Sequence, residues 1–430
     1  MLKSNLATSR RAFLKTSTAA AAMASTLSIG RSAHAQGSDA LKVGLIGCGG
    51  RGTGAAVNAL NADKSNKLVA LADAFQNQLD NSLVQLKKAK PDQIDVTPDR
   101  CFVGFDAYQK LLDCGVDVVV LGSTPHFRPR HLKAAIEAGK HVFCEKPVAV
   151  DAPGVRSVLA STELADKKGL NIVSGLCWRY HPGVQETMQR VLDGAIGDIC
   201  SMQETYITGL VGRKVKRTPE MSEMEFQMRS WYFFNWLSGD HNVEQHIHSL
   251  DKASWAMHDE PPIRAWGLGG KQLPKLGNIY DHLAVTYEYS GGVKLHAYCR
   301  QQGGCFNDTS DQYIGTKGTV NVLKHKIEGA NPWRYKGPGG NMYDLEHQAL
   351  FDAIRSGNRI NNGVYMARST MLAILGRMVC YTGKAITWDE ALNSNETLAP
   401  ETYAWDAQPP VVPAEDGTYP VALPGITKFS

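Results

Sequence analysis

The sequence predicts an α/β fold, with a doubly wound parallel sheet at the N-terminus and an α+β domain with a large, mostly antiparallel sheet after it. From Leu41 to about Pro147, short apolar runs typical of buried parallel strands alternate with helical stretches. After about residue 170, segments that alternate apolar and polar residues replace that pattern, as antiparallel strands do. No internal repeat is present.

The chain divides into four expected parts, namely a leader over 1–35, a first domain over 38–165, a second over 166–397 and a Pro-rich arm over 398–430. First-domain strands are expected over 43–46, 68–72, 116–121 and 141–144, with helices over 53–62, 75–89, 106–114 and 127–139. Second-domain strands are expected near 171–175, 201–208, 262–268, 283–289, 293–300 and 318–324, with helices near 241–257, 344–356 and 364–381. The arm is expected to extend over the surface or a neighbouring subunit.

Composition favours an ordered globular protein, because 43% of the residues are hydrophobic and only 20% are charged. Five of the 46 basic residues and none of the 42 acidic ones fall within 1–35, so the remainder carries no basic excess that would attract nucleic acid or anionic lipid. The nine cysteines are scattered without a C-x-x-C pair, which argues against a disulfide framework and a structural zinc site.

The first 35 residues are typical of an export signal. The stretch from Ser9 to Lys15 resembles a twin-arginine motif, an Ala-rich apolar run follows from Thr18 to Ile29, and Ala33-His34-Ala35 fits a cleavage site. The alternatives are an amphipathic helix or an uncleaved anchor. We expect the protein to be exported folded to a periplasmic or other extracytoplasmic space, and no later segment is long and apolar enough to span a membrane.

A glycine-rich turn follows the first strand and opens a helix, and it matches G-x-G-x-x-G from Gly47 to Gly52. Gly47 permits the tight turn, Gly49 and Gly50 let the backbone approach a pyrophosphate, and Gly52 allows helix and strand to pack closely. The helix N-terminus supplies N–H groups to the phosphates. This context indicates a Rossmann dinucleotide site, although a glycine turn without a ligand is the alternative.

Asp73 ends the second predicted strand, about 21 residues beyond the glycine turn. Its carboxylate would accept hydrogen bonds from the adenosine ribose hydroxyls and repel a 2′-phosphate, so NAD is favoured over NADP. Arg51 could touch a phosphate, which keeps NADP possible.

Two further motifs make the chain similar to a known family. Cys144-Glu145-Lys146-Pro147 follows the strand over 141–144, and Ser123-Thr124-Pro125-His126 ends the strand over 116–121. Together with the glycine turn they resemble the Gfo/Idh/MocA family of sugar and cyclitol dehydrogenases, over about residues 40–395. The resemblance implies a Rossmann domain and an open-faced sheet that forms homo-oligomer contacts, in a dimer or tetramer. It also implies cofactor contacts from Ser123, Thr124, Pro125, His126, Glu145 and Lys146.

Lys146 is the first predicted catalytic residue, since a cation beside the reacting hydroxyl favours the alkoxide. The alternative is a surface lysine on a turn fixed by Pro147. Glu244, His248 and Asp251 match the family pattern of an acid, a histidine four residues later and an Asp three beyond, with Glu in place of the usual Asp. Those spacings place all three on one face of a helix.

His248 is predicted to be the general base or acid, Glu244 to bind a substrate hydroxyl, and Asp251 to bind substrate or support the histidine. Glu and His at helical spacing could instead bind zinc, or the histidines could be structural. We predict no metal, because proton transfer during hydride chemistry already accounts for these residues.

Arg179 follows the strand near 171–175, where the family often has a substrate-facing arginine, and a structural ion pair is the alternative. The aromatic run from Trp231 to Trp236 could line the pocket, although core packing is the commoner role. Tyr343 and His347 are further pocket residues to consider.

The sequence thus predicts an NAD(P)-dependent oxidoreductase that moves a hydride between a tightly bound nicotinamide cofactor and a sugar, cyclitol or related polyol. Two alternatives stay open. One is a redox-neutral glycoside hydrolase, lyase or epimerase that oxidises a sugar hydroxyl transiently. The other is a sensor that holds the cofactor without turnover.

Overall fold

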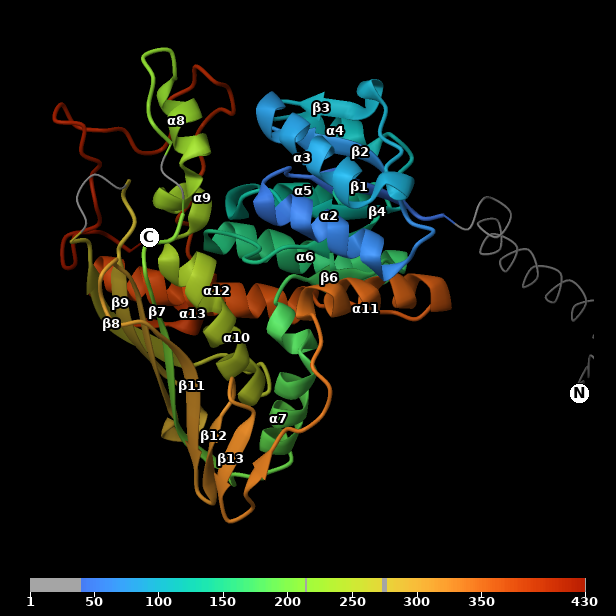
Figure 1. Cartoon of the computed structure of the whole chain (residues 1–430). Helices are drawn as coiled ribbons and strands as arrows, with labels where there is room; N and C mark the ends of the chain where they lie inside the picture. Colours follow the sequence, from blue (N-terminus) through green and yellow to red (C-terminus); the bar gives the residue numbers. More distant parts are fainter. Residues whose placement is uncertain (1–39, 213–214, 273–276, 430) are drawn as a thin grey trace, which may run out of the picture. The chain divides into compact units, whose positions relative to one another are not determined.

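The computed structural model describes residues 40–429 except 213–214 and 273–276, and the predicted signal lies outside them. The first domain holds a six-stranded parallel sheet in the order β3-β2-β1-β4-β5-β6 (Figure 1). Its strands are β1 (Lys42–Ile46), β2 (Lys67–Asp73), β3 (Cys101–Val103), β4 (Val118–Leu121), β5 (His141–Cys144) and β6 (Ile172–Ser174). This order confirms the predicted doubly wound fold.

The helices of the first domain alternate with these strands. They are α2 (Gly50–Ala62), α3 (Gln76–Ala89), α4 (Ala107–Leu112), α5 (Arg128–Glu137) and α6 (Ala152–Lys168). Local sequence sets the ends of α6, because the Asp151 side chain accepts from the Gly154 N–H and Gly169 ends the helix at φ 73°. Since β6 pairs with β5, the sheet of this domain extends past the expected boundary at residue 165.

The second domain is built on a nine-stranded mixed sheet in the order β14-β13-β12-β11-β7-β10-β9-β8-β15. Among its pairs, β7 and β10 run parallel and the others run antiparallel. Its strands are β7 (Ile199–Thr208), β8 (Arg264–Gly270), β9 (His282–Glu288), β10 (Lys294–Gln301), β11 (Asp308–Gly315), β12 (Gly318–Asn321), β13 (Lys326–Gly329), β14 (Trp333–Arg334) and β15 (Ile386–Thr387).

The remaining helices are α7 (Pro182–Leu192), α8 (Glu223–Arg229), α9 (Asn235–Ser238), α10 (Ile247–Ala256), α11 (Met342–Ser356), α12 (Gly363–Thr382) and α13 (Trp388–Leu392). A stretch of π-helix, η6 (Asn242–His246), precedes α10 where the sequence predicts one continuous helix. Helix α12 is apolar on almost every side and packs against α6 of the first domain and β8 of the second (Figure 1). One hydrophobic core runs through both domains as a result.

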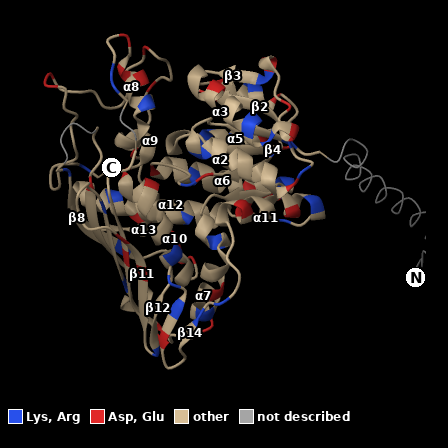
Figure 2. Ribbon diagram, in the orientation of Figure 1, with Lys and Arg blue, Asp and Glu red and all other residues tan. Residues whose placement is uncertain are grey.

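The C-terminal arm has no helix or strand among its described residues, as expected of an extended segment. It lies on its own chain, with Tyr403 and Trp405 in an apolar cluster that also contains Phe105 and Phe127. Basic and acidic residues are interspersed over both domains (Figure 2). No helix in the described part of the chain is long and apolar enough to cross a membrane.

Two glycines of α2 provide a test of this packing. A Cβ on Gly52 would lie 1.9 Å from the Gly47 carbonyl oxygen, whereas one on Gly54 would meet nothing closer than 3.6 Å. We expect Gly52→Ala to destabilise the protein by about 1–3 kcal/mol through overpacking. The matched control Gly54→Ala should stabilise it by up to about 1 kcal/mol. Urea unfolding measures both, and equal stabilities would contradict the close packing of turn and helix.

Candidate active site

A cleft of about 870 Å³ lies at the carboxyl ends of the parallel strands and is lined by both domains. The first domain contributes the glycine turn, the end of β2 and the loops after β4 and β5. The second domain contributes residues within 211–212 and 215–232 and the turn that begins α10. The predicted site residues that line the cleft are Gly47, Gly49, Gly50, Arg51, Asp73, Ser123, Thr124, Glu145, Lys146, Glu244 and His248.

The glycine turn has the geometry of a pyrophosphate site. Gly47 has φ 94°, and a Cβ there would lie 2.2 Å from the Ser123 nitrogen. Gly49 and Gly50 line the cleft, and a Cβ on either would meet nothing within 4 Å. No side chain caps α2, so its first N–H groups are open to an anion. These residues fit the phosphates of a dinucleotide, while Gly52 serves packing as predicted.

Asp73 lies at the end of β2 on the wall of the cleft. Its carboxylate accepts from the N–H groups of Cys48 at 2.6 Å and Phe75 at 2.8 Å, so it also fixes the glycine turn to the strand. Burial raises the pKa of this carboxyl, and these hydrogen bonds oppose the rise. Arg51 is held by Glu145, with Nε 3.0 Å from Oε1, and lies over the Tyr343 ring.

The motif after β4 is only partly at the cleft. Ser123 and Thr124 line it, and Ser123 shares a hydrogen bond of 3.0 Å with His131. Pro125 and His126 are not among its lining residues, which corrects the prediction that all four contact the cofactor. His126 instead shares a hydrogen bond of 2.8 Å with the Tyr403 hydroxyl, and burial lowers the pKa of its ring to about 4.

Lys146 joins the two domains at the centre of the cleft. Its Nζ donates to the Glu244 main-chain oxygen at 2.6 Å and lies 3.2 Å from Glu244 Oε1. The two side chains are 11% and 9% exposed, so water screens this ion pair weakly. Glu244 belongs to the π-helix η6, and insertions of this kind recur at functional sites.

His248 lies one turn beyond Glu244, at the start of α10, and lines the cleft. Burial lowers the pKa of its ring well below the usual value, and the cations Lys146 and Lys252 add to the shift. Its Nδ1 has no hydrogen-bond partner among the described residues. The Glu244 carboxylate binds Lys146 and Gln245, and the Asp251 carboxylate binds Arg179 and Ser369, so both acids predicted beside the histidine have other partners.

The structure does not bring Arg179 and Asp251 to the cleft, which corrects their predicted contact with substrate. Arg179 Nη2 lies 2.9 Å from Asp251 Oδ1 and 2.5 Å from Asp259 Oδ1, and its guanidinium stacks on the Tyr365 ring. Asp251 also accepts from the Ser369 hydroxyl. Neighbouring carboxylates pair with this buried arginine. Arg179 therefore forms a structural ion pair, which was the alternative to substrate binding.

Aromatic side chains form much of the cleft wall over the second domain. Trp231 and Tyr232 line it, whereas the rest of that aromatic run packs in the core. Tyr343 lines it too, but His347 stacks on Phe143 away from it. Sequence reasoning missed Trp178, Tyr206 and Arg128, which also line the cleft. Tyr206 lies in a strand that was predicted from its alternating apolar and polar residues. That alternation could have identified Tyr206 as a side chain that points inward.

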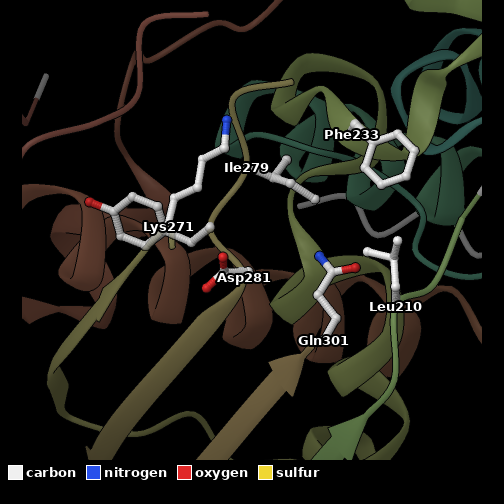
Figure 3. A pocket seen from close by; sticks show the side chains of 7 residues that line it. Leu210, Phe233, Lys271, Ile279, Asp281 and Gln301 are labelled. Atoms are coloured by element: carbon white, nitrogen blue, oxygen red, sulfur yellow. The ribbon is translucent and has the colours of Figure 1, made fainter. Parts of the chain in front are cut away.

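A second hollow lies at one end of the large sheet, lined by Phe233, Lys271, Asp281, Gln301 and their neighbours (Figure 3). Its volume is about 10 Å³, room for about one water molecule. It is too small to hold a substrate.

Comparisons with known proteins agree with this geometry. Residues 41–175 match the GFO_IDH_MocA model, described as an oxidoreductase family with an NAD-binding Rossmann fold. The inositol 2-dehydrogenase/D-chiro-inositol 3-dehydrogenase of Halalkalibacterium halodurans is 27% identical over 327 residues, 73% of this chain and 83% of that one. The 2,7-anhydro-N-acetylneuraminate hydratase of Escherichia coli is 29% identical over 257 residues, 58% of this chain and 61% of that one.

Solved structures share the fold. A levoglucosan dehydrogenase in complex with NADH and levoglucosan has a TM-score of 0.64 at 16% identity, over 81% of this chain and 99% of that one. An aldose-aldose oxidoreductase from Caulobacter crescentus has a TM-score of 0.64 at 17% identity with the same coverage. Fold, glycine turn and family match together define an NAD-binding oxidoreductase. The chain is an NAD-binding oxidoreductase whose residues 41–175 match the Gfo/Idh/MocA family model.

Replacing Lys146 separates chemistry from cofactor binding. Lys146→Met removes the cation but leaves the glycine turn and Asp73 intact, so we expect turnover to fall by about a hundred- to a thousandfold. NAD affinity, measured by calorimetry, should change little. Turnover equal to that of the wild type would contradict the assignment of Lys146.

The depressed pKa of His248 makes a prediction about pH. A general base with a lowered pKa stays neutral at the pH where a free histidine protonates, so the acid limb of kcat/KM should lie below that of a free histidine. His248→Gln should remove this acid limb and lower the rate by about 10²- to 10⁴-fold. An acid limb at pH 6.5 or above, where a free histidine titrates, would contradict the assignment.

Arg179 should matter for stability. Arg179→Met leaves the buried Asp251 without its partner, at an expected cost of about 3–5 kcal/mol in the free energy of unfolding. The control Arg190→Met removes an exposed pair with Glu186, at a cost of about 0–1 kcal/mol. Thermal unfolding compares the two, and equal losses would mean that the Arg179 pair contributes nothing beyond a surface contact.

Proposed function

We propose that this enzyme transfers a hydride between a nicotinamide cofactor that it holds through many turnovers and a secondary hydroxyl of a sugar, cyclitol or related polyol. The single observation that carries this proposal is that Lys146, Glu244 and His248 meet in the same cleft as the glycine turn and Asp73. Acid–base groups and a dinucleotide cradle in one cleft are what oxidation of an alcohol requires.

Each residue then has a defined task. Neutral His248 takes the hydroxyl proton, and Lys146 stabilises the negative charge that develops on the oxygen. Glu244 orients Lys146 and can accept a hydrogen bond from a neighbouring hydroxyl of the substrate. Trp178, Tyr206 and Tyr343 offer aromatic faces to the C–H groups of a sugar-like ring. When bound, the dinucleotide supplies the hydride acceptor or donor.

The names of relatives support this substrate class. The comparisons include inositol 2-dehydrogenases from several bacteria and a levoglucosan dehydrogenase crystallised with NADH and levoglucosan. Their substrates are cyclic polyols or anhydrosugars with several hydroxyls. We infer that this chain also oxidises one hydroxyl of such a ring.

We also propose that residues 1–35 export the folded protein by the twin-arginine route to the periplasm. An exported enzyme meets little free NAD, so its cofactor has to stay bound. Two features support such retention. Residues within 211–212 and 215–232 line the cleft from the second domain, and the Pro-rich arm packs behind Phe75 and Phe105 of the cleft wall beside Asp73. Trp405 packs behind Phe75 and Phe105, with ring centroids 5.0 and 4.6 Å away.

Arg229 closes that part of the cleft from the second domain. Its guanidinium lies 4.0 Å from the centroid of the Phe75 ring, and its Nη1 donates to Asn77 Oδ1 at 3.1 Å. We expect Arg229→Ala to speed dissociation of NAD about tenfold, the loss of about 1.4 kcal/mol. The control Arg217→Ala removes a pair with Glu223 on the same segment, away from the cleft. Unchanged dissociation in Arg229→Ala would contradict retention by this contact.

Retention of the cofactor also favours a second candidate function. A cofactor that stays bound must return to its starting oxidation state within the same cleft. One route couples two sugars as donor and acceptor, and an aldose-aldose oxidoreductase shares the fold. The other is redox-neutral, since transient oxidation acidifies the neighbouring C–H and allows elimination or inversion before the ring is reduced again. A hydratase among the relatives supports that route.

The two candidates are separated by adding sugars and glycosides to the purified mature protein and recording reduced cofactor at 340 nm with product formation. A dehydrogenase with a bound cofactor forms oxidised product steadily only when an acceptor sugar re-oxidises that cofactor. A burst of reduced cofactor with sustained glycoside cleavage would overturn the dehydrogenase proposal in favour of redox-neutral chemistry.

We further propose a homo-oligomer through the outer face of the nine-stranded sheet. Leu268, Tyr298 and Ile314 are 68%, 38% and 53% exposed. Tyr298 lies between the buried Ala297 and Cys299, and Ile314 follows the buried Tyr313, which places these two side chains on the outer side of their strands. Light scattering of the mature protein tests this proposal, and a monomer at micromolar concentration would contradict it.

A further inference from the structure

A buried lysine lies directly beneath the catalytic histidine. Lys252 follows His248 by one turn of α10, and its side chain is 1% exposed. Its Nζ donates to the His248 main-chain oxygen at 2.6 Å and lies 3.2 Å from Asp311 Oδ2. It also lies 5.4 Å from the centroid of the Trp178 ring, which lines the cleft. One ammonium group therefore contacts the histidine, the large sheet and the cleft wall.

Two carboxyl groups accompany this lysine. Asp311 on β11 and Glu204 on β7 pair in register, and both are completely buried. Glu204 Oε1 accepts from the Tyr313 hydroxyl at 3.0 Å, and its Oε2 has no partner among the described residues. Burial and the charge of Asp311 raise the pKa of Glu204, which favours its neutral form, and the carboxylate that Lys252 contacts is that of Asp311.

This pair is costly to bury, which argues for a role beyond packing. Taking two charges out of water costs several kcal/mol for each ion, and apolar residues of similar size would hold the sheet and helix together at least as well. Because Lys252 Nζ donates to the His248 main-chain oxygen, the histidine is the group on which this charge acts.

Cations dominate the surroundings of His248. Lys146 approaches from the cleft and Lys252 from beneath, and both disfavour a protonated imidazole. Other titratable groups lie on the elements that pack against α10. They are His241 directly before η6, Glu244 and His246 of η6, Cys200, Glu204 and Tyr206 of β7, Asp308, Asp311 and Tyr313 of β11, Cys177, Arg179 and Tyr180 of the turn before α7, Glu186 and Arg190 of α7, and Tyr365, Arg368, Arg377, Cys380 and Tyr381 of α12. Glu244 faces Lys146, Asp311 faces Lys252, and Arg179 faces Asp251, so each of these charges has its own partner.

We propose that Lys252 is a positioning residue for the reaction: it ties His248 to the large sheet through Asp311 and, opposite Lys146, supplies the second positive charge that keeps the imidazole in its base form. This inference rests on the proposed role of His248. Lys252 touches neither substrate nor cofactor and acts through the histidine alone.

The test uses labelling of His248 by diethyl pyrocarbonate, which reacts with neutral imidazole and does not depend on turnover. The rate for the peptide that contains His248 is followed by mass spectrometry between pH 4.5 and 8 in the full mature protein. The main variant is Lys252→Gln with Asp311→Asn, which keeps a donor for the His248 carbonyl and removes both buried charges together. Lys252→Met with Asp311→Asn is the second variant, in case the first does not fold.

We expect the midpoint of the labelling profile to rise by about one pH unit in either double variant, because Lys252 is hydrogen-bonded to the histidine itself whereas Asp311 lies beyond the lysine, so loss of the cation outweighs loss of the anion. Lys252→Arg keeps the charge and should keep the wild-type midpoint. Lys168→Met is the matched control, because Lys168 also donates to main-chain oxygens, those of Ile136 and Glu137, but does so away from the cleft. It should leave the midpoint unchanged.

An unchanged midpoint in a folded double variant would overturn the role of Lys252. A shift of the same size in Lys168→Met would do so too, because it would reflect general loosening. Failure of the wild-type protein to oxidise any polyol would overturn only the proposed reaction, since labelling measures the imidazole directly.

Discussion

The contact between Lys146 and Glu244 is the interaction on which the active site depends. Lys146 comes from the loop after β5 of the Rossmann domain, and Glu244 from the π-helix of the second domain, so a single buried ion pair fixes the reactive edge of one domain against the other. The shared core around α12 leaves little freedom for the domains to separate. The cleft is therefore preorganised, with Lys146 and Glu244 held by each other in a weakly solvated contact.

Charge is distributed around the cleft in pairs. Arg51 is matched by Glu145, Lys146 by Glu244 and Lys252 by Asp311. His248 has no such partner among the described residues, and the charges of Lys146 and Lys252 both lower the pKa of its ring. This arrangement separates tasks: the paired groups keep their charge and position, while the unpaired imidazole is free to take up and release a proton.

Local patterns in the sequence predicted the first domain well, because continuous apolar strands, a glycine turn and Asp73 each have a local physical cause. They did not predict β11, whose residues Asp308 to Gln312 are all polar, because Asp311 is buried by pairing with Lys252 from a distant helix. The π-helix was missed for the same reason, as the freed Glu244 carbonyl is satisfied by Lys146, 98 residues away in sequence. Arg179 and His126 were misplaced because their partners, Asp259 and Tyr403, lie far along the chain.

The most direct measurement of the central claim is a crystal structure of the mature protein with NAD and a reactive polyol. The account predicts a substrate hydroxyl within hydrogen-bonding distance of both Lys146 Nζ and the His248 ring, with its carbon facing the nicotinamide. A polyol bound elsewhere in the cleft, or a nicotinamide ring remote from Lys146, would contradict it.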